Sequence, residues 1–406
     1  MRKDLRILIL SEYWFPDGSG AELATWLYAR AWANAGADVT VLTNGRSNQT
    51  VQKESEKYRI SRLPLFNVNN RLPTYWAQFG SIPLGKTIEK EIALHDIIYV
   101  PGHWYWPIIQ AKKQKKIVVC HLHDYSILCP SDGTLLNMPS MEICNGCGYI
   151  KGGRCITSSD LPRGISWSDR AIHLVASIGA WRRYISIFPK YVDYFIFVSN
   201  SQKKLYEKVA PEVARKGTVI YNPLPKTPET EIKELGFAYL GGGYIVKGYQ
   251  NILLALSIYK PPYPFYMTKC KASERQFLEK LGVRAFSKLP PMELAKLMQK
   301  VHCIVMPSLW EETFSYNMID AMQSGKLVIA SKIGVVNELG GNSPGVFKIM
   351  RGSPEELAQA FEQVSSLDLP QARELGRSNR NRIQEIYDSF DPPTKMLSIF
   401  RSLLAR

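Results

Sequence analysis

Short apolar runs and stretches of helical periodicity alternate along the chain. Residues 5–11 form a nearly continuous apolar run, which is typical of a strand buried in a parallel sheet. Residues 21–35 then carry apolar side chains at helical spacing, and Gly36 stands where a helix usually ends. A second apolar run follows at residues 38–43. This order predicts a strand, a helix and a second, parallel strand.

The same alternation continues through the first half of the chain. Further strands are predicted at residues 97–100, 116–121 and 194–199, with helical stretches between them. Strands that alternate with helices favour a parallel sheet that is covered on both faces. The first half therefore predicts one doubly wound domain.

A proline-rich segment interrupts the pattern, which restarts beyond it. Pro223, Pro225 and Pro228 cannot all lie within regular secondary structure, so we interpret this segment as a linker. After it the sequence predicts a strand, a turn of three glycines and a helix, and later elements repeat this order. The predicted elements are strands at residues 237–240, 301–306 and 327–331 and helices at residues 250–259 and 315–323.

We therefore predict an α/β fold with two Rossmann-like, doubly wound domains. A length of 406 residues suits two domains of ordinary size. Residues 1–222 would form an N-terminal domain with a cysteine-rich loop at residues 129–155. Residues 223–380 would form the C-terminal domain, and residues 381–406 a helix that returns to the N-terminal domain.

Composition and charge exclude several classes of protein. Hydrophobic residues make up 45% and charged residues 21% of the chain, which disfavours a disordered or fibrous protein. Lysine and arginine (51) exceed aspartate and glutamate (36), for a net charge of +15. The excess is spread over both halves, and no nucleic-acid-binding motif occurs. We therefore expect an anionic surface or a phosphate-bearing ligand, and no nucleic acid partner.

The chain carries no sequence signal for membrane insertion or secretion. No apolar run reaches the ~18 residues that a spanning helix needs. The apolar stretch near the start, residues 7–10, is too short for a signal peptide. We therefore expect a cytoplasmic protein.

Residues 307–325 carry the sharpest functional signal. A predicted strand ends before this segment, a loop presents Glu311 and Glu312, and a helix begins near Ser315. The free backbone N–H groups and the positive end of that helix would hold a phosphate. Glu312 before the helix and Asp320 within it are able to accept hydrogen bonds from sugar hydroxyls. The alternative is a pair of acids that only stabilises the helix dipole.

This segment resembles the signature of the family 4 retaining glycosyltransferases (glycosyl transferases group 1), in which two acids are separated by seven residues. Glu312 and Asp320 have this separation. Other motifs of the family occur in the same order over nearly the whole chain. They are DGSGAE at residues 17–22, CHLHDYSILCP at 120–130, FVSNS at 197–201, VIYNP at 219–223 and YLGGGYIVKG at 239–248. The resemblance implies the GT-B fold, in which two Rossmann-like domains face each other across a cleft.

The resemblance also implies a role for each matching residue. A nucleotide-diphosphate sugar would lie against the second domain, with Lys247 on the diphosphate, Glu312 on the sugar hydroxyls and Asp320 on the ribose. His123 would face the sugar from the first domain, with His103 as the second candidate. No metal ion would be required for catalysis. The remaining donor-binding positions are the backbone of Phe314, Ser315 and Tyr316 and the turns at Gly242 and Gly243 and at Gly18 and Gly20.

Three positions depart from the family pattern. Gly242 replaces an arginine that would donate two hydrogen bonds to phosphate, so catalysis would depend more on Lys247. Asp320 replaces a glutamate, and Ser315 replaces a glycine. These departures leave a non-catalytic binding subunit as one alternative function of the chain. A sugar-nucleotide epimerase or hydrolase on the same fold is another. Dinucleotide oxidoreduction is disfavoured because the first turn lacks the third glycine of that fingerprint.

Four of the seven cysteines fall within one loop-rich segment: Cys129, Cys144, Cys147 and Cys155. Cys144 and Cys147 have the two-residue spacing that lets two thiolates reach one tetrahedral metal ion. A structural zinc site is our first interpretation. A disulfide pair and an iron–sulfur cluster are the alternatives.

Residues 166–190 combine tryptophan and aliphatic side chains with arginine and lysine. A basic amphipathic helix of this kind can lie on an anionic bilayer, with Trp181 beside Arg182 and Arg183 as the apolar anchor. The alternative is a helix that packs on the first domain and has a basic edge in solvent.

These observations together predict a retaining glycosyltransferase of the hexosyltransferase type. It would move a sugar from a nucleotide-diphosphate sugar to a saccharide or lipid-linked acceptor in glycan biosynthesis. We expect it in the cytoplasm, peripheral on the inner face of the membrane.

Overall fold

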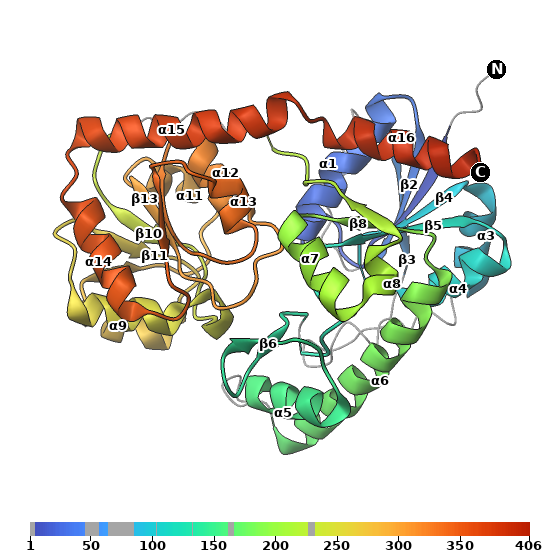
Figure 1. Cartoon of the computed structure of the whole chain (residues 1–406), viewed down its shortest axis with the longest axis horizontal. Helices are drawn as coiled ribbons and strands as arrows, with labels where there is room; N and C mark the ends of the chain where they lie inside the picture. Colours follow the sequence, from blue (N-terminus) through green and yellow to red (C-terminus); the bar gives the residue numbers. More distant parts are fainter. Residues whose placement is uncertain are drawn as a thin grey trace. The chain divides into compact units, whose positions relative to one another are not determined.

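The computed structural model describes residues 5–44, 57–63, 85–102, 104–131, 133–160, 166–225 and 232–406. The chain forms two compact units (Figure 1). The first unit consists of Met1–Pro225 and Asp391–Arg406, and the second of Lys226–Phe390.

The first unit is built on a parallel sheet of seven strands in the order β3-β2-β1-β4-β5-β8-β9. The first strand lies inside the sheet, and the order reverses between β1 and β4. This is the doubly wound arrangement that the sequence predicted. The strands are β1 (Arg6–Leu10), β2 (Asp38–Asn44), β3 (Arg59–Leu63), β4 (Ile97–Val100), β5 (Ile117–Leu122), β8 (Tyr194–Phe197) and β9 (Gly217–Val219).

Helices lie on both sides of this sheet (Figure 1). Gly36 ends the first of them with φ +87°, a conformation that favours glycine, and so confirms the predicted cap. A two-stranded hairpin of β6 (Leu136–Asn137) and β7 (Glu142–Ile143) precedes α5. The helices of the first unit are α1 (Gly20–Asn34), α3 (Gly85–Leu94), α4 (Tyr105–Lys113), α5 (Tyr149–Asp160), α6 (Trp167–Tyr191), α7 (Asn200–Val209), α8 (Pro211–Ala214) and α16 (Pro392–Leu404).

The last helix, α16, packs beside α1 in the first unit (Figure 1). The Trp32 indole donates a hydrogen bond of 3.2 Å to the Pro393 carbonyl, and its ring lies 5.2 Å from that of Phe400. The sequence placed the start of this returning segment at residue 381. The structure places it at Asp391, because α15 (Leu369–Asp388) continues through residue 381 within the second unit.

The second unit has a parallel sheet of six strands in the order β12-β11-β10-β13-β14-β15, which reverses between β10 and β13. Ligands of such sheets bind outside the carboxyl ends of the strands at this reversal. The strands are β10 (Phe237–Tyr239), β11 (Phe265–Met267), β12 (Val283–Ala285), β13 (Cys303–Met306), β14 (Leu327–Ser331) and β15 (Val346–Ile349). The helices are η2 (Ile245–Lys247), α9 (Tyr249–Ile258), η3 (Ala272–Glu274), α10 (Arg275–Lys280), α11 (Pro291–Met298), α12 (Tyr316–Gln323), α13 (Val336–Gly340), α14 (Pro354–Ser365) and α15.

A buried asparagine fastens α15 to the second sheet. The Asn379 side-chain amide donates to the carbonyls of Lys326 and Gly345 at 2.8 and 2.9 Å. Gly376, one turn earlier on α15, has no room for a Cβ, which would lie 1.9 Å from the Gly325 carbonyl oxygen. The close approach of α15 therefore depends on a glycine and on a fully hydrogen-bonded buried amide.

Lys326 is a buried lysine in this region. Lys326 is fully buried, and its Nζ atom has no hydrogen-bond partner among the described residues. Burial lowers the pKa of Lys326 from 10.5 to about 8, because the ammonium loses its hydration. At neutral pH the folded chain therefore holds a charge that opposes folding.

We predict that Lys326→Met stabilises the second unit at pH 7 by about 3 kcal/mol, the free energy of this pKa shift. Between pH 8 and 10.5 the unfolded wild-type chain binds more protons than the folded chain, so wild-type stability rises with pH. The advantage of the variant should therefore shrink towards pH 10. Urea unfolding of wild type, Lys326→Met and the exposed control Lys300→Met at pH 7 and 10 measures this. An advantage of equal size at both pH values would contradict the prediction.

Candidate active site

The centre of the site in the second unit is the Glu312 carboxylate. Glu312 follows β13 in the loop before α12 and is only 2% exposed. Its Oε1 atom accepts hydrogen bonds from Lys247 Nζ at 2.7 Å and from Ser308 Oγ at 2.6 Å. Trp310 Nε1 donates to the same oxygen at 3.1 Å. Three donors therefore compensate the burial of this carboxylate.

Lys247 reaches Glu312 from the loop that follows β10. Its ammonium also lies 4.9 Å from the centre of the Trp310 ring, within the range of a cation–π contact. The side chain of Lys247 nevertheless keeps 37% of its surface exposed. A ligand that carries negative charge can therefore approach the same ammonium that now pairs with Glu312.

A glycine brings the two loops together. Gly248 has φ +78°, and a Cβ at this position would lie 1.9 Å from the Pro307 carbonyl oxygen. The Leu309 N–H donates to the Val246 carbonyl at 2.8 Å and joins the same loops. In the sequence motif that ends in Lys247-Gly248, the glycine thus allows close backbone packing and the lysine supplies the charge.

The loops after β14 and β15 close the site from the other side. Gly334 has φ +50°, and a Cβ there would lie 2.4 Å from the Glu312 carbonyl oxygen. Burial raises the pKa of Glu311, an effect that a backbone hydrogen bond from Gly334 and the charge of Arg351 oppose. Arg351 also donates to the Leu309 carbonyl at 3.2 Å. Glu311 and Arg351 therefore hold the loop that carries Glu312.

Lys269, after β11, adds a second cation that sequence reasoning missed. It has φ +60°, a strained conformation for a residue other than glycine. The pKa of Lys269 is lowered, first by desolvation from the surrounding loops and then by the charges of Lys288 and Lys247. Lys269 keeps solvent contact even so. Positive charge therefore gathers at this edge of the sheet.

Lys269 can lie at this edge of the sheet because residue 242 is a glycine. A Cβ at Gly242 would come within 3.1 Å of Lys269 Cβ and 3.2 Å of its carbonyl oxygen. An arginine at position 242, as in the family pattern, would compete with Lys269 for this space. Lys269, at the end of the neighbouring strand, therefore occupies the space beside position 242.

The predicted phosphate-binding helix is α12. It begins at Tyr316 with Ser315 as the N-cap residue, and the rings of Phe314 and Tyr316 pack 5.2 Å apart. The backbone of these three residues therefore forms the helix N-terminus, where N–H groups lack helical partners. Asp320 is half-buried within α12. Gly243 lies in the turn after β10, where a Cβ would be 3.4 Å from the Glu274 carboxylate.

The first unit has a site of its own at the carboxyl ends of β1, β4 and β5. A cavity of about 180 Å³ lies there. His123 lines it beside the buried His121, whose ring centre is 4.2 Å away. Burial and the neighbouring His123 hold the pKa of His121 well below its usual value. Other residues that line the cavity are Ser11, Glu12, Ser19, Glu22, Gly102, Asp124 and Ser126.

The glycine turn before α1 is shaped by Glu22. The Glu22 carboxylate accepts hydrogen bonds from the backbone and the hydroxyl of Ser19, at 2.6 and 3.1 Å, as a capping box does. Gly18 has φ +95°, and a Cβ there would lie 2.4 Å from Glu22 Cδ. Gly20 is the first residue of α1. His103, the second histidine candidate, lies outside the described residues.

The four clustered cysteines are free thiols. Burial is the main cause that raises the pKa of Cys129 to about 12 and of Cys147 to about 11, and neighbouring thiols add to it. In the part of the chain that the structure describes, no three His, Cys, Asp or Glu side chains are placed to hold a metal ion. The predicted zinc site, of Cys129 and Cys147 together with Cys144 and Cys155, gains no support from this geometry and stays a prediction.

Comparison with known sequences relates part of the second unit to a glycosyltransferase family. Residues 267–366 match the family described as Glycosyl transferases group 1, so the predicted resemblance to group 1 glycosyltransferases is confirmed for this part of the chain. An uncharacterized 42.6 kDa protein from the cps region of Klebsiella pneumoniae is 22% identical over 375 residues. That match covers 84% of this chain and 89% of the relative.

Solved structures confirm the predicted fold of two Rossmann-like domains, that of GT-B glycosyltransferases. Anabaena HepE, in complex with UDP and glucose, has a TM-score of 0.67 at 17% identity, covering 98% of this chain and 99% of that one. Sucrose-phosphate synthase from Thermosynechococcus elongatus has a TM-score of 0.69 at 16% identity, covering 99% of both chains. WaaG, a glycosyltransferase involved in lipopolysaccharide biosynthesis, has a TM-score of 0.65 at 14% identity, covering 97% and 99%.

We predict that Lys269→Met weakens binding of a nucleoside diphosphate by about 10- to 100-fold, the loss expected for one hydrogen bond to a charged group. Titration calorimetry with UDP measures the change. Lys280→Met, on the exposed end of α10, is the matched control and should bind as wild type does. Equal affinity of all three proteins would show that Lys269 does not reach the diphosphate.

Proposed function

We propose that this chain is a retaining hexosyltransferase, which moves a sugar from a nucleotide-diphosphate sugar to a saccharide or lipid-linked acceptor. The observation that carries the proposal is the contact between Lys247 and Glu312 at the reversal of the second sheet. A partly exposed cation and a buried acceptor lie together there, beside the N-terminus of α12. HepE, of similar fold, has been solved in complex with UDP-glucose, and this supports the choice of donor class.

Departure of the diphosphate is the step that the second unit would assist. Negative charge builds on the diphosphate as the glycosidic C–O bond breaks. The ammonium groups of Lys247 and Lys269 and the N–H groups at the start of α12 would be donors already in place once the nucleotide sugar has bound. Such preorganised donors lower the barrier because they need no rearrangement when the charge appears.

Donor binding would exchange the partners of Glu312. When Lys247 turns to the diphosphate, Ser308 and Trp310 keep their hydrogen bonds to Glu312 Oε1. A hydroxyl of the transferred sugar then takes the place of the ammonium. The exchange keeps the buried carboxylate hydrogen-bonded throughout, and it makes sugar binding and diphosphate binding depend on each other.

The first unit would select the acceptor. His123 lines a cavity together with Glu12 and Glu22, and oxygen and nitrogen acceptors of this kind suit the hydroxyls of a saccharide. A cytoplasmic, membrane-peripheral location would give the enzyme access to a lipid-linked acceptor. We propose that no metal ion takes part in the transfer, as the resemblance to the family 4 glycosyltransferases implies, and that Lys247 and Lys269 provide the positive charge.

Acceptor-dependent release of nucleoside diphosphate tests this function. The protein is incubated with UDP-glucose and other nucleotide sugars, with and without saccharide and lipid-linked acceptors, and the anomeric configuration of the product is read by NMR. Retention in a new glycoside is the expected result. Release that needs only water, or an epimerised donor, would replace the proposal by a hydrolase or an epimerase. Tight donor binding without turnover on any acceptor would replace it by a binding subunit.

We predict that Glu312→Gln lowers turnover about 100-fold or more while the fold is kept, since an amide oriented by Ser308 and Trp310 lacks the charge that aligns the sugar and balances Lys247. Glu311→Gln is the matched control one residue away. Its side chain interacts with Gly334, and an amide oxygen can still accept that hydrogen bond. Turnover of both variants under the same assay, with circular dichroism as the fold check, measures the effect. Near-wild-type turnover of Glu312→Gln would refute its assigned role.

A further inference from the structure

Helix α6 has two apolar faces, of which only one is covered by the residues that the structure describes. The covered face holds Trp181 and Phe188, which are 6% and 1% exposed. The Trp181 indole donates to the Ile127 carbonyl at 3.1 Å inside the first unit. The expectation that Trp181 anchors the helix in a membrane is therefore wrong, because this side chain packs inward.

The opposite face of α6 is apolar and exposed. Trp167 and Val175 are 78% and 73% exposed, and Ile172 and Ile185 are exposed as well. At about 100° per residue, these side chains and Arg182 fall within one half of the helix surface. A helix that only packed on its own domain would present polar side chains here. This face therefore has the composition of a contact surface.

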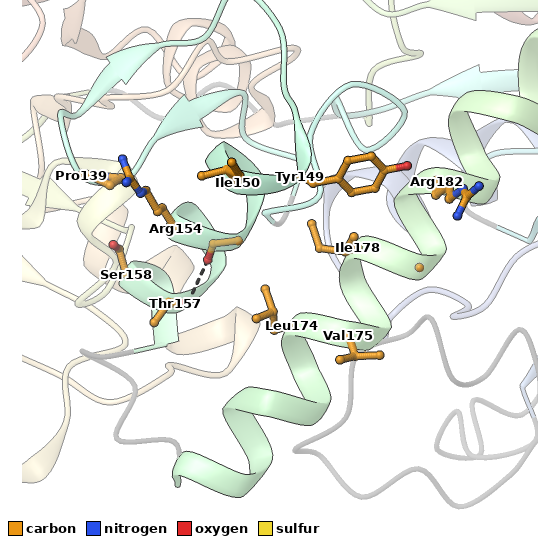
Figure 2. A pocket seen from close by; sticks show the side chains of 12 residues that line it. Pro139, Tyr149, Ile150, Arg154, Thr157, Ser158, Leu174, Val175, Ile178 and Arg182 are labelled. Atoms are coloured by element: carbon orange, nitrogen blue, oxygen red, sulfur yellow. Dashed lines mark hydrogen bonds between the residues drawn. The ribbon is translucent and has the colours of Figure 1, made fainter.

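A groove between α5 and α6 continues this face. It has a volume of about 880 Å³ and apolar walls that include Tyr149, Leu174 and Ile178 (Figure 2). Ile150, at its rim on α5, is 77% exposed. Arg154 and Arg182 lie towards opposite ends of the groove (Figure 2). The groove is thus lined by apolar side chains and has an arginine towards each end.

The charge around the groove is positive. Helices α5 and α6 carry six basic residues against two acidic ones. The basic residues are Lys151, Arg154, Arg170, Arg182, Arg183 and Lys190, and the acidic ones are Asp160 and Asp169. Among the described residues, no helix is both long and apolar enough to cross a bilayer.

We propose that the exposed face of α5 and α6 docks on a bilayer that contains anionic phospholipid. Trp167, Ile172 and Val175 would enter the interface, as aromatic and aliphatic residues of interfacial helices do. An acyl chain would lie in the groove, and Arg154 and Arg182 would contact lipid phosphates. The apolar face together with its basic charge favours an anionic bilayer over a neutral one.

Sedimentation of the full chain with vesicles tests this proposal. Vesicles of phosphatidylcholine alone are compared with vesicles that also contain phosphatidylglycerol, at low salt and at ~0.5 M salt, where charges are screened within a few ångströms. We expect binding to the anionic vesicles that weakens with salt. Absent binding, or equal binding to both kinds of vesicle, overturns the proposal.

Paired variants locate the surface. Val175→Glu should lower partitioning about tenfold, while Leu254→Glu, at another exposed apolar position on α9, should not. Arg182→Gln should weaken binding to anionic vesicles, with Arg377→Gln on α15 as its control. If Val175→Glu binds vesicles as wild type does, or instead dissociates a dimer of the chain in solution, the face does not dock on lipid. Because no sugar donor is present, these outcomes are independent of the proposed transferase activity.

Discussion

The burial of the Glu312 charge is the constraint on which the site of the second unit depends. A carboxylate this deep needs donors close by, and Lys247, Ser308 and Trp310 provide them. These donors come from two loops that meet only because the strand order reverses between β10 and β13. The buried charge and the sheet topology are therefore parts of one arrangement, and the loops are held by glycine contacts that no larger residue permits.

The two units have the same sheet topology and carry different side chains at the point where the strand order reverses. Each sheet reverses its order beside its first strand, and each has functional groups at the carboxyl ends there. In the second unit these groups include Lys247 and Lys269, which suit an anionic leaving group. In the first unit they include His123 and Glu12 around a small cavity, which suit hydroxyl groups. One chain thus offers two environments of contrasting charge.

Buried elements were predictable from the sequence, and the reason is physical. Strands β4 and β14 have the bounds that their apolar runs predicted, because strands buried on both faces carry few polar residues. The contact of Lys247 with Glu312 agrees with the placing of both residues in one site. Lys269 could not be assigned to the site from the sequence, since its position beside Lys247 depends on the pairing of β11 with β10. Spacing likewise predicted α6 but not which apolar face packs inward.

The return of α16 to the first unit has a consequence for the order in which the chain folds during synthesis. Trp32 packs against Phe400, so the core near α1 closes only after α16 has been synthesised. The second unit is continuous in sequence and is complete earlier. The unit that is synthesised first is therefore finished last, and until then its unpaired apolar surface is open to chaperones and proteases.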